Sequence, residues 1–170
     1  MNDRDYTHRM DSWTIKRNNI TDNYIHNASR YIVNYAIENN VSAIVIGKNN
    51  NWKQGSKMNK KVNQTFVQIP FAKLIQMITY KAEEVSISVI PTEESYTSGT
   101  SFLDNETPTK EYYNKSRRVH RGLFKCNNGN LINADVNGSL QILKKVFPKA
   151  YTNGIEAVAL QPVVVNACLI

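Results

Sequence analysis

The sequence is poor in the features that mark several protein classes. It has two cysteines in 170 residues, Cys126 and Cys168, which is too few for the disulfide framework of a small secreted domain. It contains no run of about 18 apolar residues, the length that a membrane-spanning helix requires. The first ten residues, MNDRDYTHRM, lack the apolar segment of a signal peptide. These absences favour a cytoplasmic protein without a membrane partner.

Acidic side chains are also scarce, with 14 Asp and Glu against 21 Lys and Arg, for a net charge of +7. The cations gather in two loop-like segments, interleaved with Trp52, Tyr112 and Tyr113. Cations and aromatic rings together suit a phosphate backbone with unstacked bases. The candidate nucleic-acid-binding residues are Lys48, Trp52, Lys53, Lys57, Lys60, Lys61, Arg117, Arg118 and Arg121. From charge alone, two solvated loops without a ligand explain the pattern equally well.

Hydrophobic periodicity predicts an α/β protein. The apolar, β-branched run at 41–47 is typical of a strand covered on both faces, and a second such run lies at 86–91. Apolar residues at helical spacing predict helices at about 22–38, 70–85 and 135–147. In the last helix the predicted core stripe comprises Val136, Leu140, Leu143 and Phe147.

Three acidic residues stand where these elements begin or end. Glu93 and Glu94 follow the second strand, and Asp135 lies in the first turn of the last helix. An acid in a first helical turn is stabilised by the free backbone amides and the helix dipole, so a lone Asp at position 135 is more often an ordinary cap than a functional residue. Glu93 and Glu94 are explained equally well as solvated acids at a strand end.

Three segments, in order along the chain, resemble one protein family. The segment N-A-D-V-N-G-S at 133–139 resembles the D-x-N-A-A segment that closes the RuvC-like nuclease domain of TnpB (OrfB) proteins of insertion sequences, which are related to type V CRISPR effector nucleases. Ala43–Lys48 followed by Trp52-Lys53 resembles the buried strand of that family, and Y-K-A-E at 80–83 with Y-T-S at 96–98 resembles a third stretch. The resemblance runs from about residue 18 to residue 147.

The resemblance implies an incomplete RNase H-like (RuvC) layer, with a degenerate zinc-ribbon-like hairpin inserted before the last helix. The implied division is 1–95 for the first RuvC-like part, 96–131 for the ribbon, 132–150 for the last helix and 151–170 for a tail. The four cysteine positions of the ribbon fall near Ser101, Asp104, Cys126 and Gly129. One thiol cannot supply the four ligands of a structural zinc, so we expect no zinc. A small apolar cluster of Phe102, Leu103, Leu123 and Phe124 is expected in its place.

The same resemblance implies a Mg²⁺-dependent active site built from three acids. Asp135 matches the last of them, whereas Gly47 stands where most members carry a glutamate. A carboxylate from the neighbouring strand end could reach the same metals, so Glu93 is the first choice and Glu94 the second. Catalytic roles are therefore predicted for Glu93 and Asp135, and metal ligation for Glu93, Glu94 and Asp135. The first acid of the family has no counterpart here.

We therefore expect the C-terminal portion of a TnpB/OrfB-type, RNA-guided DNA endonuclease that is inactive alone, with DNA, guide RNA and possibly a separate N-terminal chain as partners. The alternative is a nuclease-dead remnant that binds nucleic acid through its basic loops. A plain structural domain has the least support. Whether the chain is an enzyme is left open. Because two parallel strands leave sheet edges unpaired, we expect poor solubility alone or docking to a partner chain.

Overall fold

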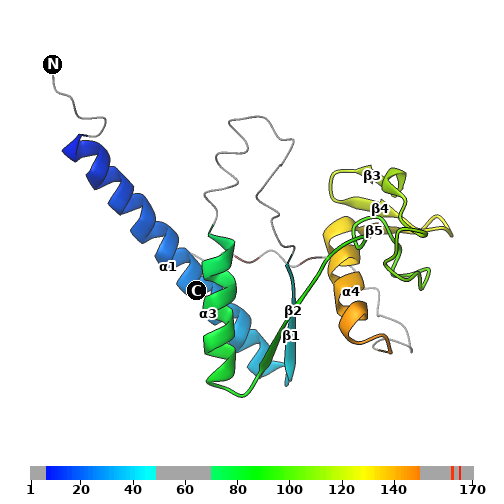
Figure 1. The fold of residues 1–170 in the computed structure, drawn as a ribbon, viewed down its shortest axis with the longest axis horizontal. Helices are drawn as coiled ribbons and strands as arrows, with labels where there is room; N and C mark the ends of the chain where they lie inside the picture. The colour runs from blue at the N-terminus through cyan, green and yellow to red at the C-terminus, as the bar shows by residue number, and fades with distance from the viewer. Residues whose placement is uncertain (1–6, 49–69, 150–161, 163–164, 166–170) are drawn as a thin grey trace. The chain divides into compact units, whose positions relative to one another are not determined.

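The structure is a computed structural model that describes residues 7–48, 70–149, 162 and 165. Within this part it is a small α/β fold with three α-helices and two small sheets (Figure 1), as the sequence predicted. None of these helices is long and apolar enough to cross a bilayer. The elements are α1 His8–Glu38, β1 Ala43–Gly47, α3 Phe71–Glu83, β2 Ser88–Thr92, the 3₁₀ turn η1 Lys115–Arg117, β3 Arg118–His120, β4 Leu123–Lys125, β5 Leu131–Asn133 and α4 Ala134–Val146.

The described residues form two compact units, which divide after Ile44 and after Val89. The first unit is a helix pair. Only the second half of α1 packs on α3, through a face that contains Ile25, Val33 and Ala36. The first half, which extends the helix 14 residues before the predicted start, is almost entirely exposed. An isolated stretch of this length is marginal in water, so the packed half must nucleate the helix.

The core of the first unit lies between α1, α3 and the beginnings of the two strands. Val33 and Ala36 of α1 meet Ala82 of α3 and Ile87, and Val41, Ile44 and Val89 pack around them. The chain leaves α1 through Asn40, which has a positive φ of 52° that Asn tolerates. The two strands run in the same direction, because Ser88 N donates to Ser42 O and Lys48 N donates to Thr92 O. The predicted parallel pair is therefore confirmed.

The second unit contains the antiparallel sheet β3-β4-β5 and α4. Leu123, Phe124 and Lys125 pair with Asn133, Ile132 and Leu131. The tight connection between these strands uses Gly129, whose φ of +86° suits a residue without a Cβ. The apolar cluster here comprises Phe124, Cys126, Ile132 and Ala134, with Leu103, Val136 and Leu140 against it. Two of the four residues predicted to form a cluster, Leu103 and Phe124, are thus members.

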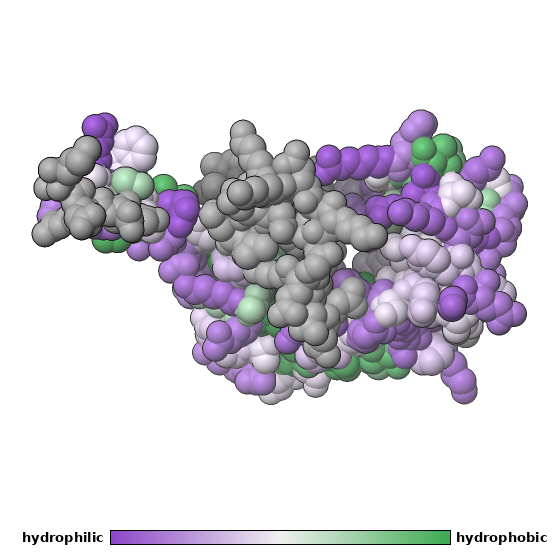
Figure 2. Space-filling model, turned by 45° about the horizontal axis from the view of Figure 1, so that its top comes forward, coloured by the Kyte–Doolittle hydropathy of each residue, from purple (hydrophilic) through white to green (hydrophobic). Residues whose placement is uncertain are grey.

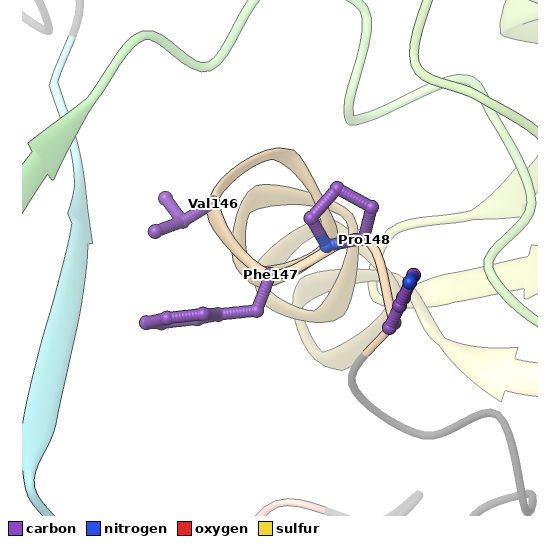
Figure 3. Close-up of a pocket in the computed structure, with 4 residues that line it drawn as sticks. Val146, Phe147 and Pro148 are labelled. Atoms are coloured by element: carbon purple, nitrogen blue, oxygen red, sulfur yellow. The ribbon is translucent and has the colours of Figure 1, made fainter.

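Helix α4 begins where the sequence placed it, since the side chain of Asn133 accepts hydrogen bonds from the amides of Asp135 and Val136 at 2.9 and 3.1 Å. The most buried side chains of α4 are not the predicted apolar stripe. They are the amides of Asn137 and Gln141, which are fully buried, whereas Phe147 is 39% exposed. At the helix end, Val146 and Phe147 point to one side and Pro148 lies on the other, around a shallow apolar depression (Figure 3).

The buried amides of α4 hold the irregular segment that precedes the small sheet. Asn137 Oδ1 accepts from Phe102 N at 2.9 Å, and Asn137 Nδ2 donates to Thr100 O at 2.8 Å. Gln141 Nε2 donates to Glu106 O at 3.2 Å. A buried segment without regular structure has backbone groups that need partners, and the amide side chains supply them. This is why polar residues occupy the face that periodicity assigns to a core.

Candidate metal site and nucleic-acid interface

A carboxylate lies where the side chain of residue 47 would begin. A Cβ built on Gly47 would meet Oε2 of Glu94 at 2.9 Å and Cδ1 of Ile142 at 2.7 Å. Glu94 is half-buried and comes from the turn after β2, and Ile142 comes from α4. The absent side chain at the end of β1 therefore leaves space that the Glu94 carboxylate reaches.

The neighbouring Glu93 has a different role in the structure. Its Oε1 accepts from the amide and the hydroxyl of Ser95, and its Oε2 lies 3.3 Å from Nζ of Lys145. The side chain of Glu93 is 60% exposed. Lys145 also donates to the carbonyls of Glu93 and Ser95. Glu93 thus terminates a turn and pairs with α4, and it is Glu94 that lies against β1.

Asp135 is placed in the first turn of α4, as predicted, and its side chain is 87% exposed. It forms an ion pair with Arg118, whose Nη2 lies 3.8 Å from Oδ1. Asp135, Gly138 and Ile142 are separated by three and four residues, so they share one face of the helix. A Cβ on Gly138 would contact nothing within 4 Å. The face of α4 that begins at Asp135 therefore has open space at Gly138 and reaches the Cβ position of Gly47 through Ile142.

These donors are too few for a complete two-magnesium site. Carboxylate oxygens are suitable ligands for Mg²⁺, but such a site needs several of them to converge. Among the described residues no group of three or more Asp, Glu, His or Cys is close enough to hold a metal ion. The prediction that Glu93, with Glu94 as the second choice, and Asp135 bind metal therefore stays a prediction, and no reaction step follows from it.

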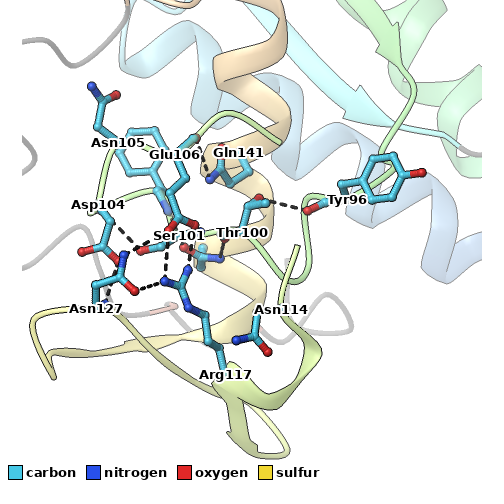
Figure 4. Close-up of polar contacts among 12 residues, drawn as sticks. Tyr96, Thr100, Ser101, Asp104, Asn105, Glu106, Asn114, Arg117, Asn127 and Gln141 are labelled. Atoms are coloured by element: carbon cyan, nitrogen blue, oxygen red, sulfur yellow. Dashed lines mark hydrogen bonds and ion pairs between the residues drawn. The ribbon is translucent and has the colours of Figure 1, made fainter. Parts of the chain in front are cut away.

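Where a zinc ribbon would carry its metal, the structure has a polar network (Figure 4). Arg117 forms a two-pronged ion pair with Glu106, with Nη1–Oε2 at 2.7 Å and Nη2–Oε1 at 3.0 Å. The side chains are only 13% and 10% exposed. Asn127 bridges the pair, since it contacts Arg117 Nη2 and donates to Glu106 Oε1. Glu106 Oε2 also accepts from Ser101 N at 2.8 Å.

Of the four positions that the resemblance matches to zinc ligands, Ser101 and Asp104 belong to this network. Asp104 Oδ2 accepts from Asn127 N at 2.8 Å, and Ser101 Oγ accepts from Asp104 N at 3.3 Å. Burial raises the pKa of the Cys126 thiol, which a hydrogen bond with Ser101 partly offsets. A structural zinc needs four ligands, and Cys126 is the only thiol among the four positions matched to them. The residues present therefore suit hydrogen bonding between the two turns and do not match a tetrahedral zinc site.

The predicted nucleic-acid-binding residues divide into three groups. Lys48, Arg118 and Arg121 are exposed. Arg117 is engaged by Glu106 and faces inward. Trp52, Lys53, Lys57, Lys60 and Lys61 lie outside the described residues. On the visible face of the second unit, hydrophilic residues dominate (Figure 2).

An aromatic pair adds to this surface. The rings of Tyr96 and Tyr113 meet edge to face at 5.8 Å, and both residues are partly exposed, as is Tyr112. The ring of Tyr113 lies against Gly99, where a Cβ would come within 2.5 Å of it. Gly99 is therefore needed for this contact. The lysines and arginines at 110–121 flank exposed rings, as single-strand-binding surfaces require.

Sequence reasoning missed two residues that organise these units. Glu106 lies in an aperiodic loop, and its only signal was its position between cationic segments. Lys81, which entered the argument only through the Y-K-A-E resemblance, is fully buried in the first unit. Its Nζ donates to Ser29 Oγ at 2.7 Å and to His26 O at 2.8 Å. Lysine is almost never buried without a partner, so no composition rule points to it.

Comparisons with known proteins agree with these observations. Residues 71–142 match the family model described as "Cas12f1-like, TNB domain". No curated protein matches the sequence. A solved structure, the cryo-EM structure of a Cas12f1–sgRNA–target DNA complex, superposes with a TM-score of 0.62 at 20% identity, over 79% of this chain and 36% of that chain. The chain thus spans about a third of that effector protein. Residues 71–142 are similar to a Cas12f1-like TNB domain, and the chain has the fold of part of a Cas12f1 protein.

Proposed function

We propose that this chain is the C-terminal nuclease portion of an RNA-guided DNA endonuclease of the TnpB and Cas12f1 type, and that Glu94 and Asp135 are its two metal-binding acids. The observation that carries the proposal is the position of the Glu94 carboxylate, 2.9 Å from the Cβ that Gly47 lacks. The resemblance to TnpB proteins implies a glutamate at that strand end. The Glu94 carboxylate, which follows β2, supplies the same charge near the end of β1. Asp135 lies on the face of α4 whose Ile142 contacts the same position.

The proposal prefers Glu94 to Glu93 because of what each side chain contacts. The Glu93 carboxylate lies beside Ser95 and Lys145, and its side chain is largely exposed. Glu94 lies between β1 and α4, where the two remaining parts of a RuvC-like site would meet. The first acid must come from a preceding segment or a separate chain. With two carboxylates a hard cation is held weakly, so we expect no cleavage by this chain alone.

The experiment is a complementation assay with Mg²⁺ or Mn²⁺. The full chain is mixed with the N-terminal portion of a close relative, guide RNA and target DNA, and cleavage is measured. We expect Glu94→Ala and Asp135→Ala to abolish cleavage, and Glu93→Ala to reduce it only slightly. Glu111→Ala, an exposed acid away from these elements, is the matched control. Loss of cleavage in Glu93→Ala but not in Glu94→Ala would show that the first sequence-based choice was correct.

A reciprocal exchange sharpens the same test. Gly47→Glu combined with Glu94→Ala moves the carboxylate to the strand end at which most relatives carry it. Removing the Glu94 side chain makes room, and the remaining close neighbour is the flexible tip of Ile142. We expect the exchange to recover part of the cleavage that Glu94→Ala loses. No recovery, with the fold intact by circular dichroism, would contradict a shared position for the two carboxylates.

A second candidate function is nucleic-acid binding without cleavage. The exposed arginines Arg118 and Arg121 and the rings of Tyr112 and Tyr113 favour it. This remnant function would give guide or target binding that is unchanged in Glu94→Ala and Asp135→Ala and weakened in Arg118→Gln with Arg121→Gln. Binding with no cleavage in the complementation assay would select this candidate.

A further inference from the structure

The outward face of α1 carries a line of exposed large side chains. Met10, Trp13, Ile20, Tyr24 and Tyr35 are 47%, 67%, 62%, 48% and 55% exposed. Their spacing places them along one side of the helix, because residues three, four and seven apart lie above one another. The side that packs on α3 is opposite. The outward line is therefore not a continuation of the core, and nothing in the described residues covers it.

Charges on the first half of α1 are sorted between its two sides. Arg9, Lys16 and Arg17 lie at helical spacing from Trp13 and share its side. Asp11 and Asp22 lie on the opposite side, and Asp22 is 2.6 Å from the lysine of α3 at position 73. The outward side thus combines exposed rings with cations and contains no acid over residues 8–22.

Trp13 is the centre of this arrangement. The guanidinium of Arg9 lies 5.4 Å from the centroid of its ring. A depression beside the ring is lined by Lys16, Arg17, Ile20 and Thr21. A nucleobase stacked on the indole would place its phosphates near these cations. Further along the same side, Tyr31 and Tyr35 stack at 6.3 Å, which continues the row of rings.

We propose that the outward face of α1, from Arg9 to Tyr35, binds single-stranded nucleic acid. Rings that accept stacked bases and cations that accept phosphates are the two components of a strand-binding surface that ignores sequence. Charge argues against a second copy of the chain as the occupant, since pairing two such faces would oppose Arg9, Lys16 and Arg17 to one another. The proposal rests on the proposed function, and it adds a surface on the first unit, apart from the basic loops already named.

The test measures fluorescence anisotropy of a labelled 12-nucleotide single-stranded RNA with the full chain. The double variant Trp13→Ala, Tyr24→Ala is expected to weaken binding about tenfold, because each stacked base contributes appreciably. Its matched control is Ile15→Ala, which removes an equally exposed apolar side chain, 60% exposed, from the other side of the helix.

A second pair of variants tests the charges. Lys16→Gln with Arg17→Gln is expected to lower the magnitude of the slope of log K against log salt concentration by about 1.4. Its control, Arg30→Gln, changes a cation of the same helix that lies 4.0 Å from Glu84. Circular dichroism verifies that all these exposed substitutions keep the helix.

The outcomes separate this inference from the proposed function. If the parent chain binds RNA and Arg118→Gln with Arg121→Gln weakens binding while the α1 variants match their controls, the α1 inference is overturned and the proposed function stands. The outward face would then be a protein-docking surface. If the parent chain binds no RNA or DNA, the α1 inference is overturned, and the complementation assay decides the proposed function separately. Selective weakening by the α1 variants supports the inference.

Discussion

The two units bury a cation in different ways. In the first, Lys81 is fully buried, and its ammonium donates to His26 O and Ser29 Oγ and lies 3.1 Å from His26 Nδ1, with no ion pair to a carboxylate within the described part of the chain. In the second, the Arg117 guanidinium meets the Glu106 carboxylate in a two-pronged pair. A cation without a counter-ion keeps its desolvation cost, whereas a well-paired cation offsets much of it. The two units should therefore respond oppositely to the loss of the buried charge.

Titration reflects the same contrast. Burial lowers the pKa of Lys81, and nearby Arg30 lowers it further while Glu84 opposes both. For Glu106, burial acts to raise the pKa, but the hydrogen bonds from Arg117 and the backbone prevail and lower it. The surroundings thus disfavour the charged form of Lys81 and favour the charged form of Glu106.

The largest expected effect follows from breaking the pair in the second unit. Glu106→Gln leaves the Arg117 charge buried without a counter-ion, and we expect a loss of about 3 kcal/mol in the free energy of unfolding. Urea unfolding followed by the fluorescence of the full chain measures it. Glu111→Gln, an exposed acid five residues on, should change stability by less than about 0.5 kcal/mol. Equal effects of the two substitutions would show that the pair does not hold the unit.

Lowering the pH should reproduce part of the loss of stability that the Glu106→Gln substitution causes. Because the folded pKa of Glu106 lies below its ordinary value of 4.5, its stabilisation is fully present above that pH and is lost as pH falls through the folded pKa. The parent chain should therefore lose more stability than Glu106→Gln between pH 5 and pH 2, measured by urea midpoints. Parallel pH curves for the two proteins would contradict this.

A smaller effect of opposite sign is expected for Lys81→Met. Methionine keeps the apolar stem and removes the ion, so stability at pH 7 should rise by about 1 kcal/mol or less. The folded pKa of Lys81 is below its ordinary value of 10.5, so between these values the unfolded state binds more protons and the parent gains stability as pH rises. That gain should be absent in Lys81→Met and present in Lys73→Met, a control at an exposed lysine. If Lys81→Met lowered the free energy of unfolding as much as Glu106→Gln, the two units would not differ in how they tolerate loss of the buried charge.

The smallest effect on stability is expected at the residue next to Arg117. Arg118 is exposed and only 3.8 Å from a highly exposed Asp135. Arg118→Gln should change the free energy of unfolding by less than about 0.5 kcal/mol, because exposed ion pairs contribute little. It should instead weaken nucleic-acid binding, as measured by anisotropy. Arg117→Gln, at the neighbouring position, is the comparison variant. It should lower the free energy of unfolding by more than Arg118→Gln does.

The sequence was sufficient for the elements with a clear period. Strands β1 and β2 and the presence of three helices follow from apolar spacing, although α1 begins 14 residues before its predicted start and the buried face of α4 includes two amides. The capping side chain of Asn133 marks the start of α4. The residues of the candidate metal site were harder to predict. Strand alternation favoured Glu93, but β2 ends at Thr92 and the chain then turns, so alternation no longer decides which glutamate faces β1. Side-chain direction in a turn depends on contacts, here with Ser95 and Lys145.

The polar interior was beyond sequence reasoning for a related reason. Glu106 and Arg117 are eleven positions apart in a segment without hydrophobic periodicity, and only the folded network brings them together. Similarly, α4 turns Asn137 and Gln141 inward because the segment at 100–106 offers unpaired backbone groups. Hydrophobic patterns record burial of apolar area and carry no information on which buried amide meets which carbonyl.

The parallel pairing of β1 and β2 has a consequence for the order of folding. The two strands join at residues 42 and 88, so their contact closes a loop of more than 40 residues, which is entropically costly until another contact has shortened it. Docking of α3 on the second half of α1 shortens this loop, because α3 ends five residues before β2 begins. The helix pair should therefore form before the strands pair. Any partner strand that adds to this sheet would then meet an edge whose alignment has already been set.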